Sequence, residues 1–179
     1  MKIFQVTNDV ERYQSLLPVK DSVWDRRSTR FHGHPLEAIW KPFDVFALKP
    51  LLKEDDFYYF HPGAFIAGPR GRELAATPLE MSGELLPVRC PKKKGEFFVF
   101  NVTNCLDVLD EEATEFERPD DPTYKGDIFK CVFHGDRFTE ASVFRIARPP
   151  VDIFCIERTG DPQDGEFKAM VEANGLEGL

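Results

Sequence analysis

The apolar residues of this chain fall in short runs that proline, glycine or charged residues interrupt. In the first run, Lys2–Val6, apolar and polar positions alternate, which is typical of a strand with one buried face. The run at 96–102, EFFVFNV, is the richest in aromatic and β-branched residues, and we expect it to lie inside a sheet. Further strands are predicted at 57–60 and 64–67, with His61-Pro62-Gly63 as the turn between them, and at 84–90 and 128–133.

The closing stretch, 140–179, changes from strand patterns to a helical one. Apolar runs at 141–147 and 151–156 flank Pro149-Pro150 and predict two strands, and the turn-rich passage 159–165 follows them. After this passage the apolar residues recur at the helical period of 3.6 residues. The predicted helix has Asp164 as N-cap, an apolar stripe of Phe167, Met170, Val171 and Leu176, an opposite face of Glu166, Lys168 and Glu172, and a left-handed C-cap at Gly175.

Shorter helices are predicted at three other places. One begins at Asn8 or Asp9 and extends through Leu16, one covers 70–76 and ends before Pro78, and one covers 111–116 with Asp110 as its N-cap.

The remaining segments are predicted to be irregular or peripheral. Residues 18–35 lack periodicity and form a long loop, and the prolines within 36–52 favour extended or edge structure. A chain of 179 residues has the length of one domain. We therefore expect a strand-rich α+β fold, a single domain over 1–179 with a mainly antiparallel sheet and a few short helices, including a C-terminal helix.

The net charge of −8 is unevenly distributed. Residues 1–95 contain 15 Lys and Arg against 12 Asp and Glu, whereas residues 96–179 contain 8 against 19. The acidic residues concentrate at 107–121, where Arg118 is the only basic residue. Such a segment attracts basic partners and repels nucleic acid, although a solvated loop would have the same composition. The candidate partner-binding residues are Asp110, Glu111, Glu112, Glu115, Glu117, Asp120 and Asp121.

The cysteines and the apolar runs indicate the compartment. The four cysteines are isolated, show no CxxC spacing and lie mostly in apolar runs, so we expect buried free thiols in a reducing environment. The N-terminus lacks the apolar core of a secretory signal, and no apolar run approaches the ~18 residues that span a bilayer. A pI near 5.1 argues against nucleic-acid binding. The sequence thus predicts a cytoplasmic protein without a membrane or nucleic-acid partner.

Candidate catalytic groups are few. His32 and His34 would share a face of an extended chain, and with His61 they could serve a metal-dependent hydrolase, yet no HExxH motif or other ligand set accompanies them. Cys105 has acidic neighbours that would raise its pKa and weaken it as a nucleophile. The Gly-Pro-Arg-Gly-Arg stretch at 68–72 lacks the phosphate-loop pattern. No cofactor is predicted.

Three motifs, taken in order, carry a family resemblance. They are ELLPV at 84–88; FVFNV at 98–102 with CLDVLD at 105–110; and VFRI at 143–146 with IFCI at 153–156 and FKAMVEANGLEGL at 167–179. In this order they resemble family eleven of the immunity proteins of bacterial polymorphic toxin systems, most clearly over 84–179. Pro78 departs from the family pattern, because it interrupts a region where a helix is expected.

The resemblance implies a function without catalysis. A protein of this family would be a cytoplasmic antidote, made beside a toxin, that neutralises the cognate toxin by stoichiometric binding. If that toxin acts on nucleic acid, its cleft must be basic, and the acidic segment could occupy it as a phosphate mimic. A general protein-interaction adaptor is the other non-catalytic interpretation.

Overall fold

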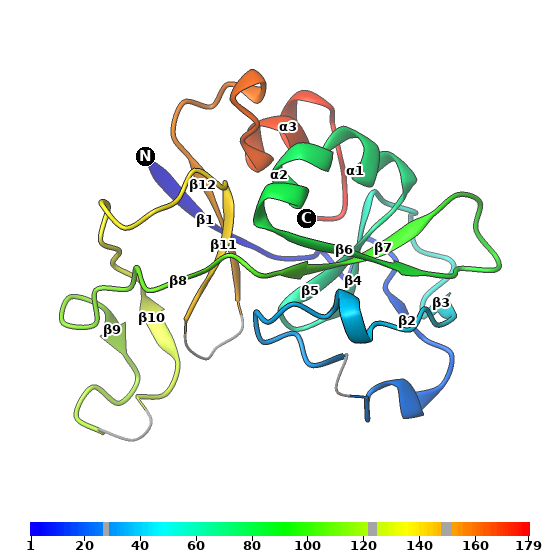
Figure 1. Cartoon of the computed structure of the whole chain (residues 1–179), viewed down its shortest axis with the longest axis horizontal. Coiled ribbons are helices and arrows are strands. Elements are labelled where there is room, and N and C mark those ends of the chain that lie inside the picture. Colours follow the sequence, from blue (N-terminus) through cyan, green and yellow to red (C-terminus); the bar gives the residue numbers. More distant parts are fainter. Residues whose placement is uncertain (27–28, 122–124, 148–151) are drawn as a thin grey trace.

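The computed structural model describes residues 1–26, 29–121, 125–147 and 152–179. The described residues form two four-stranded sheets, two two-stranded ribbons and three α-helices, which confirms a strand-rich α+β fold (Figure 1). The first half contains β1 (Lys2–Val6), β2 (Leu16–Pro18), β3 (Val45–Ala47), β4 (Phe57–His61), β5 (Ala64–Ala67), α1 (Pro69–Leu74), α2 (Ala76–Ser82) and β6 (Gly83–Val88). The second half contains β7 (Phe97–Val102), β8 (Cys105–Leu106), β9 (Glu115–Phe116), β10 (Ile128–Lys130), β11 (Val143–Ile146), β12 (Ile153–Glu157) and α3 (Phe167–Ala173).

The two larger sheets are mainly antiparallel, as predicted. The N-terminal sheet has the order β4-β5-β7-β6, so β7 is an interior strand, in agreement with its composition. The C-terminal sheet has the order β1-β12-β11-β8, and its β8–β11 pair is parallel. The first and twelfth strands therefore lie side by side, which joins the two ends of the chain in one sheet.

The two large sheets separate three apolar cores, so that each sheet lies between two cores. In β5, Ala64 and Ile66 enter the core beneath the N-terminal loops, whereas Phe65 and Ala67 enter the middle core. The middle core also receives α2, α3 and one face of the C-terminal sheet. The other face of that sheet, including Phe144, packs against apolar residues of 106–116 and 128–138. Because strand side chains alternate between faces, each sheet is buried on both sides.

Two helices replace the one predicted near Pro78. The helix predicted at 70–76 is confirmed as α1, which ends at Leu74, before Pro78. The expectation that Pro78 interrupts this region is wrong, because α2 begins at Ala76 and contains Pro78. Pro78 is the third residue of α2, where a backbone N–H would have no acceptor within the helix. Leu79, in the next turn, is fully buried in the middle core, and this burial favours the helix.

Helix α3 ends as predicted but begins differently. Gly175 adopts the left-handed conformation with φ of 57°. Its N–H donates to the carbonyl of Glu172, and the N–H of Leu176 donates to that of Val171, as in a Schellman cap. Asp164 is not the N-cap, since it ends a separate 3-10 helix, Pro162–Asp164.

The residue at the N-cap position of α3 is Glu166, and it does not lie on an exposed face as predicted. Its side chain is buried and accepts hydrogen bonds from the N–H groups of Arg158, Thr159 and Gly160. The carboxylate therefore organises the loop that precedes the helix.

Two of the predicted helices, at 8–16 and 111–116, do not form. Residues 8–16 form a turn that leads into β2, because Leu16 is completely buried and pairs with Ala47 of β3. Residues 111–116 form one turn followed by β9, because Phe116 pairs with Ile128 across a ribbon. Tertiary pairing overrides the weak local preference of short segments. The predicted break at Pro149-Pro150 lies outside the described residues.

Candidate partner-binding surface

The acidic residues lie on a projecting arm, which we define as residues 110–121 and 125–130 and call the acidic arm. Figure 1 shows its ribbon, β9–β10, at one end of the molecule, outside the two large sheets and next to β8. Thr114 and Phe116 point inward and are buried, whereas Glu115 and Glu117 alternate with them and are exposed. The strand alternation therefore displays carboxylates on the outside of the arm.

Asp110 shapes the start of the arm. Its Oδ1 atom accepts hydrogen bonds from the N–H groups of Glu112 and Ala113, both at 3.1 Å. The N–H of Thr114 donates to the carbonyl of Asp110, which closes one turn. The prediction that Asp110 caps this segment is thus confirmed for a single turn, and its carboxylate has a structural role.

Basic residues, most of them distant in the sequence from their partners, offset part of the charge. Lys125 lies 2.9 Å from Glu111, and Lys130 lies 3.3 Å from Glu115. Arg118 is 3.8 Å from Glu117, and Arg137 is 3.8 Å from Asp107. Exposed pairs of this kind contribute little stability, about 0–1 kcal/mol each. They nevertheless lower the net negative charge that a partner would meet.

Two of the candidate residues have a carboxylate that is not paired with a basic side chain of the described residues. Glu112 and Asp120 are exposed, and neither forms an ion pair with any residue that the structure describes. Asp121 is half-buried at the border of the described region. The structure therefore places all seven candidate residues on one arm but assigns them different surroundings.

One exposed aromatic residue on the arm has no counterpart in the sequence prediction. Phe129 in β10 is 72% exposed, although β10 was predicted from its apolar residues. Large aromatic side chains that are surrounded by polar groups often anchor protein–protein interfaces. The signal in the sequence is the alternation within β10, which places Phe129 on the opposite side of the strand from the half-buried Ile128.

The three histidines are not brought together. His32 and His34 are exposed in a loop. The ring of His61 packs 5.3 Å from that of Trp24 and 5.7 Å from that of Phe31, and its Nδ1 atom lies 2.7 Å from the carbonyl oxygen of Pro62. Within the described ranges, no group of three or more His, Cys, Asp or Glu residues is arranged to hold a metal ion.

The four cysteines are free. Cys90 and Cys155 are buried, as predicted, but Cys131 is half-buried and Cys105 is exposed. Desolvation raises the pKa of the Cys105 thiol, and Arg145 opposes this shift. The predicted direction is confirmed, but the cause is desolvation and not the acidic neighbours.

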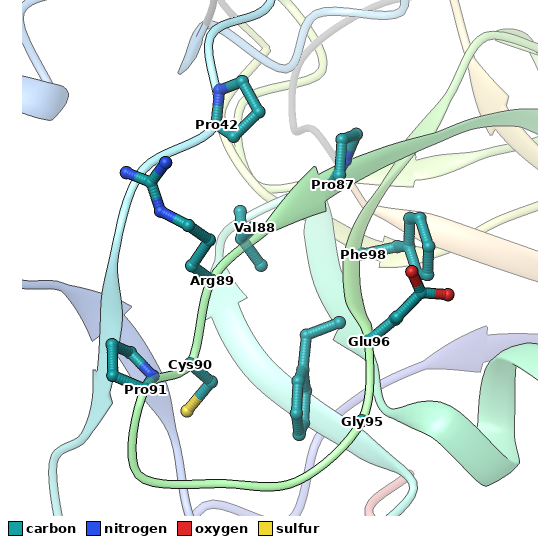
Figure 2. A pocket seen from close by; sticks show the side chains of 10 residues that line it. Pro42, Pro87, Val88, Arg89, Cys90, Pro91, Gly95, Glu96 and Phe98 are labelled. Carbon is teal, nitrogen blue, oxygen red and sulfur yellow. The ribbon is translucent and has the colours of Figure 1, made fainter.

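A hollow at the end of the β6–β7 hairpin has little catalytic potential. It is lined by Pro42, Pro87, Val88, Arg89, Cys90, Pro91, Gly95, Glu96, Phe97 and Phe98. Figure 2 shows Arg89 and Glu96 on opposite walls, and Arg89 is engaged by Asp44 at 2.6 Å. Burial raises the pKa of the Cys90 thiol, so this group is a poor nucleophile.

The closing sequence GLEGL is held by the first half of the chain. The N–H groups of Asp56 and Phe57 both donate to the carbonyl of Glu177 at 3.1 Å. In return, the N–H of Glu177 donates to Asp56 Oδ2 at 3.0 Å, and Arg70 donates to the same oxygen at 2.7 Å. Arg70 also reaches the carbonyls at the end of α3, including that of Gly175. Arg72 forms an ion pair with Glu80. Both arginines of the stretch considered for phosphate binding, Arg70 and Arg72, therefore bind groups of the protein itself.

Two further contacts complete this C-terminal anchor. The side chain of Asn8 donates to the carbonyls of Gly178 and Phe57, at 2.9 and 3.1 Å. Lys53 lies 2.6 Å from the carboxylate of Glu177. The closing motif GLEGL therefore has a structural role. It depends on Asn8 and Lys53, which precede the region of clearest family resemblance, 84–179.

A buried carboxylate lies beside this anchor. Neither carboxylate oxygen of Asp55 has a hydrogen-bond partner among the described residues. Burial raises the pKa of Asp55 from its ordinary value of 3.8 to about 8, and Lys93 only partly opposes this shift. At neutral pH the folded protein therefore holds a proton on Asp55.

This protonation makes stability depend on pH. Between about pH 4 and 8, the folded chain binds a proton that the unfolded chain has released, so the free energy of unfolding falls as the pH rises. Substitution Asp55→Asn should flatten this dependence and make the variant more stable than the wild type at pH 8. Thermal unfolding of both proteins across this range measures the effect, and parallel profiles would contradict it.

None of the helices in the described part of the chain has the length and apolar character needed to cross a lipid bilayer.

The comparisons with known proteins agree with the sequence motifs. No curated protein matches the chain. The model of the immunity protein family (Imm11) matches residues 90–179, a region that begins just after β6 and runs through the acidic arm to the C-terminal anchor. This match covers half of the chain, and the chain therefore belongs to the immunity protein family Imm11.

Proposed function

We propose that this protein neutralises a cognate toxin of a polymorphic toxin system by binding it stoichiometrically in the cytoplasm of the producing cell. The observation that carries the proposal is the match of residues 90–179 to an immunity protein family. The free cysteines are consistent with a reducing compartment. In this proposal the protein is not an enzyme, and it requires no cofactor.

The acidic arm is the proposed contact with the toxin. It projects from the molecule, displays carboxylates and carries the exposed ring of Phe129. Exposed carboxylates accelerate association with a basic protein, and a central aromatic side chain can supply affinity. We infer that the toxin presents a basic surface, as a nucleic-acid-directed enzyme would.

The proposed functional unit is the whole chain, residues 1–179. The support for this is the C-terminal anchor, in which Asn8, Asp56 and Arg70 hold the backbone of the closing residues. A fragment restricted to residues 90–179 would lose these contacts and three of the four strands of the N-terminal sheet, since only β7 lies within it.

Co-expression tests the proposal. The toxin domain encoded next to this gene is expressed in a bacterial host, with or without this protein, and colony formation is counted. We expect this protein to restore growth, because bound toxin cannot act. An unrelated toxin of the same chemical activity is the control, and it should remain lethal. Full toxicity of the cognate domain, despite soluble protein, would refute the proposal.

A further inference from the structure

The outer face of the β2–β3 ribbon is apolar where solvent-facing positions are normally polar. Leu17 pairs with Phe46 across the ribbon, so their side chains point to the same side. Val19 and Leu48 follow at the ends of the two strands and continue the alternation. We call these four residues, together with Leu51 on the next turn, the ribbon face. Val19, Phe46, Leu48 and Leu51 are 55%, 40%, 49% and 99% exposed.

The fold holds the ribbon face in this exposed position. The alternate residues of the same strands, Leu16 and Val45, are buried in the core below, so the ribbon cannot invert without exposing them. The turn that carries Leu51 is fixed by the buried side chain of Gln14, which donates to the carbonyls of Pro50 and Leu52 at 3.3 and 2.7 Å. An exposed leucine on an anchored turn is well placed for a partner's pocket.

A lysine lies at each end of the ribbon face. Lys20 follows Val19, and Lys49 follows Leu48 at the opposite end, because the two strands are antiparallel. Neither lysine forms an ion pair with the residues of the described ranges. An occupant with carboxylates on both sides of an apolar centre would complement this arrangement. A second copy of this chain packed face to face would instead oppose lysine to lysine, which is unfavourable.

We propose that the ribbon face is a second docking surface for the cognate toxin, occupied by a part of that polypeptide in which apolar side chains lie between carboxylates. This inference rests on the proposed function. Figure 1 shows β2 and β3 at the opposite end of the molecule from β9 and β10, so this part of the toxin is distinct from the basic surface that meets the acidic arm. Two separated contacts on one partner raise affinity, because the second forms within the complex.

The test measures binding of the cognate toxin, in a catalytically inactive form, to purified full-length proteins. The variant Phe46→Ser/Leu51→Ser should lower affinity about tenfold or more, because exposed apolar anchors supply binding energy. The control Ile39→Ser/Met81→Ser removes two other exposed apolar residues, which are 48% and 53% exposed and lie outside the ribbon face, and it should leave affinity unchanged. Lys20→Glu/Lys49→Glu should weaken binding mainly at low salt.

Three outcomes would overturn the inference. Equal affinities of the wild type and the ribbon variant would show that the toxin does not contact this face. A wild-type dimer in light scattering that the ribbon variant abolishes would assign the face to self-association. Failure of the wild type to bind the toxin would refute the proposed function itself, and this result is distinguishable from the other two.

Discussion

Substitution Gly178→Ala should strongly destabilise the protein. Gly178 has a φ of 105°, in a region that residues with a side chain rarely adopt. A Cβ atom at this position would lie 2.1 Å from the carbonyl oxygen of Phe57 and 2.9 Å from Asp55 Oδ2. The backbone contact cannot give way without separating the C-terminal anchor from the N-terminal sheet. We expect a loss of roughly 2–4 kcal/mol, and hence a decrease in the melting temperature of about 5–15 °C.

Gly175→Ala is the matched control for this prediction. Gly175 also has a positive φ, 57°, but a Cβ atom there would meet nothing within 4 Å. Only the conformational penalty remains, about 1 kcal/mol. Thermal unfolding of the two variants separates the steric contribution from the backbone contribution. Equal melting temperatures would mean that the approach of Gly178 to Phe57 does not constrain the fold.

Reversal of free charges on the acidic arm should slow association with the toxin. Changing Glu111, Glu112, Glu115 and Glu117 to lysine would remove the most charge, but three of these residues also lose ion pairs within the arm. Glu112→Lys/Asp120→Lys avoids this complication, because neither residue is paired with a described residue. We expect an association rate about tenfold lower at low salt, with a weaker salt dependence, measured by stopped-flow fluorescence.

The control for the arm variant changes the net charge equally elsewhere. Glu11 and Asp25 are exposed and lie outside the acidic arm, so Glu11→Lys/Asp25→Lys should reduce the association rate far less. If both double variants associate equally slowly, only the total charge matters and the arm has no special role. If neither differs from the wild type, the toxin does not meet the arm.

The longer strands of the two large sheets could be predicted from the sequence, because each of these sheets has an apolar core on both of its faces. Ranges such as 57–60, 64–67 and 96–102 are nearly continuous apolar runs, and this pattern follows directly from burial between two layers. The short helices were less predictable. Residues 8–16 and 111–116 have helical capping signals, but pairing with β3 and β10, which are distant in the sequence, determines their conformation.

The sequence predicted the acidic composition of the acidic arm, but it did not predict which carboxylates are neutralised by ion pairs. A charge run identifies Glu111 and Glu115, whereas their partners Lys125 and Lys130 reach them only because the chain reverses through the ribbon. The C-terminal anchor could not be predicted for a similar reason. Asp56 and Arg70 meet Glu177 and the end of α3 across more than a hundred residues, and no local pattern encodes such contacts.

The most direct measurement is a titration of the purified toxin domain with this protein, in which the remaining toxin activity is followed. The account predicts that activity falls linearly and disappears at one equivalent, because a tight complex blocks the toxin. Wild-type activity of the toxin at a large excess of this protein would contradict the account. A loss of toxin activity at far less than one equivalent would also contradict it, because the protein would then act catalytically.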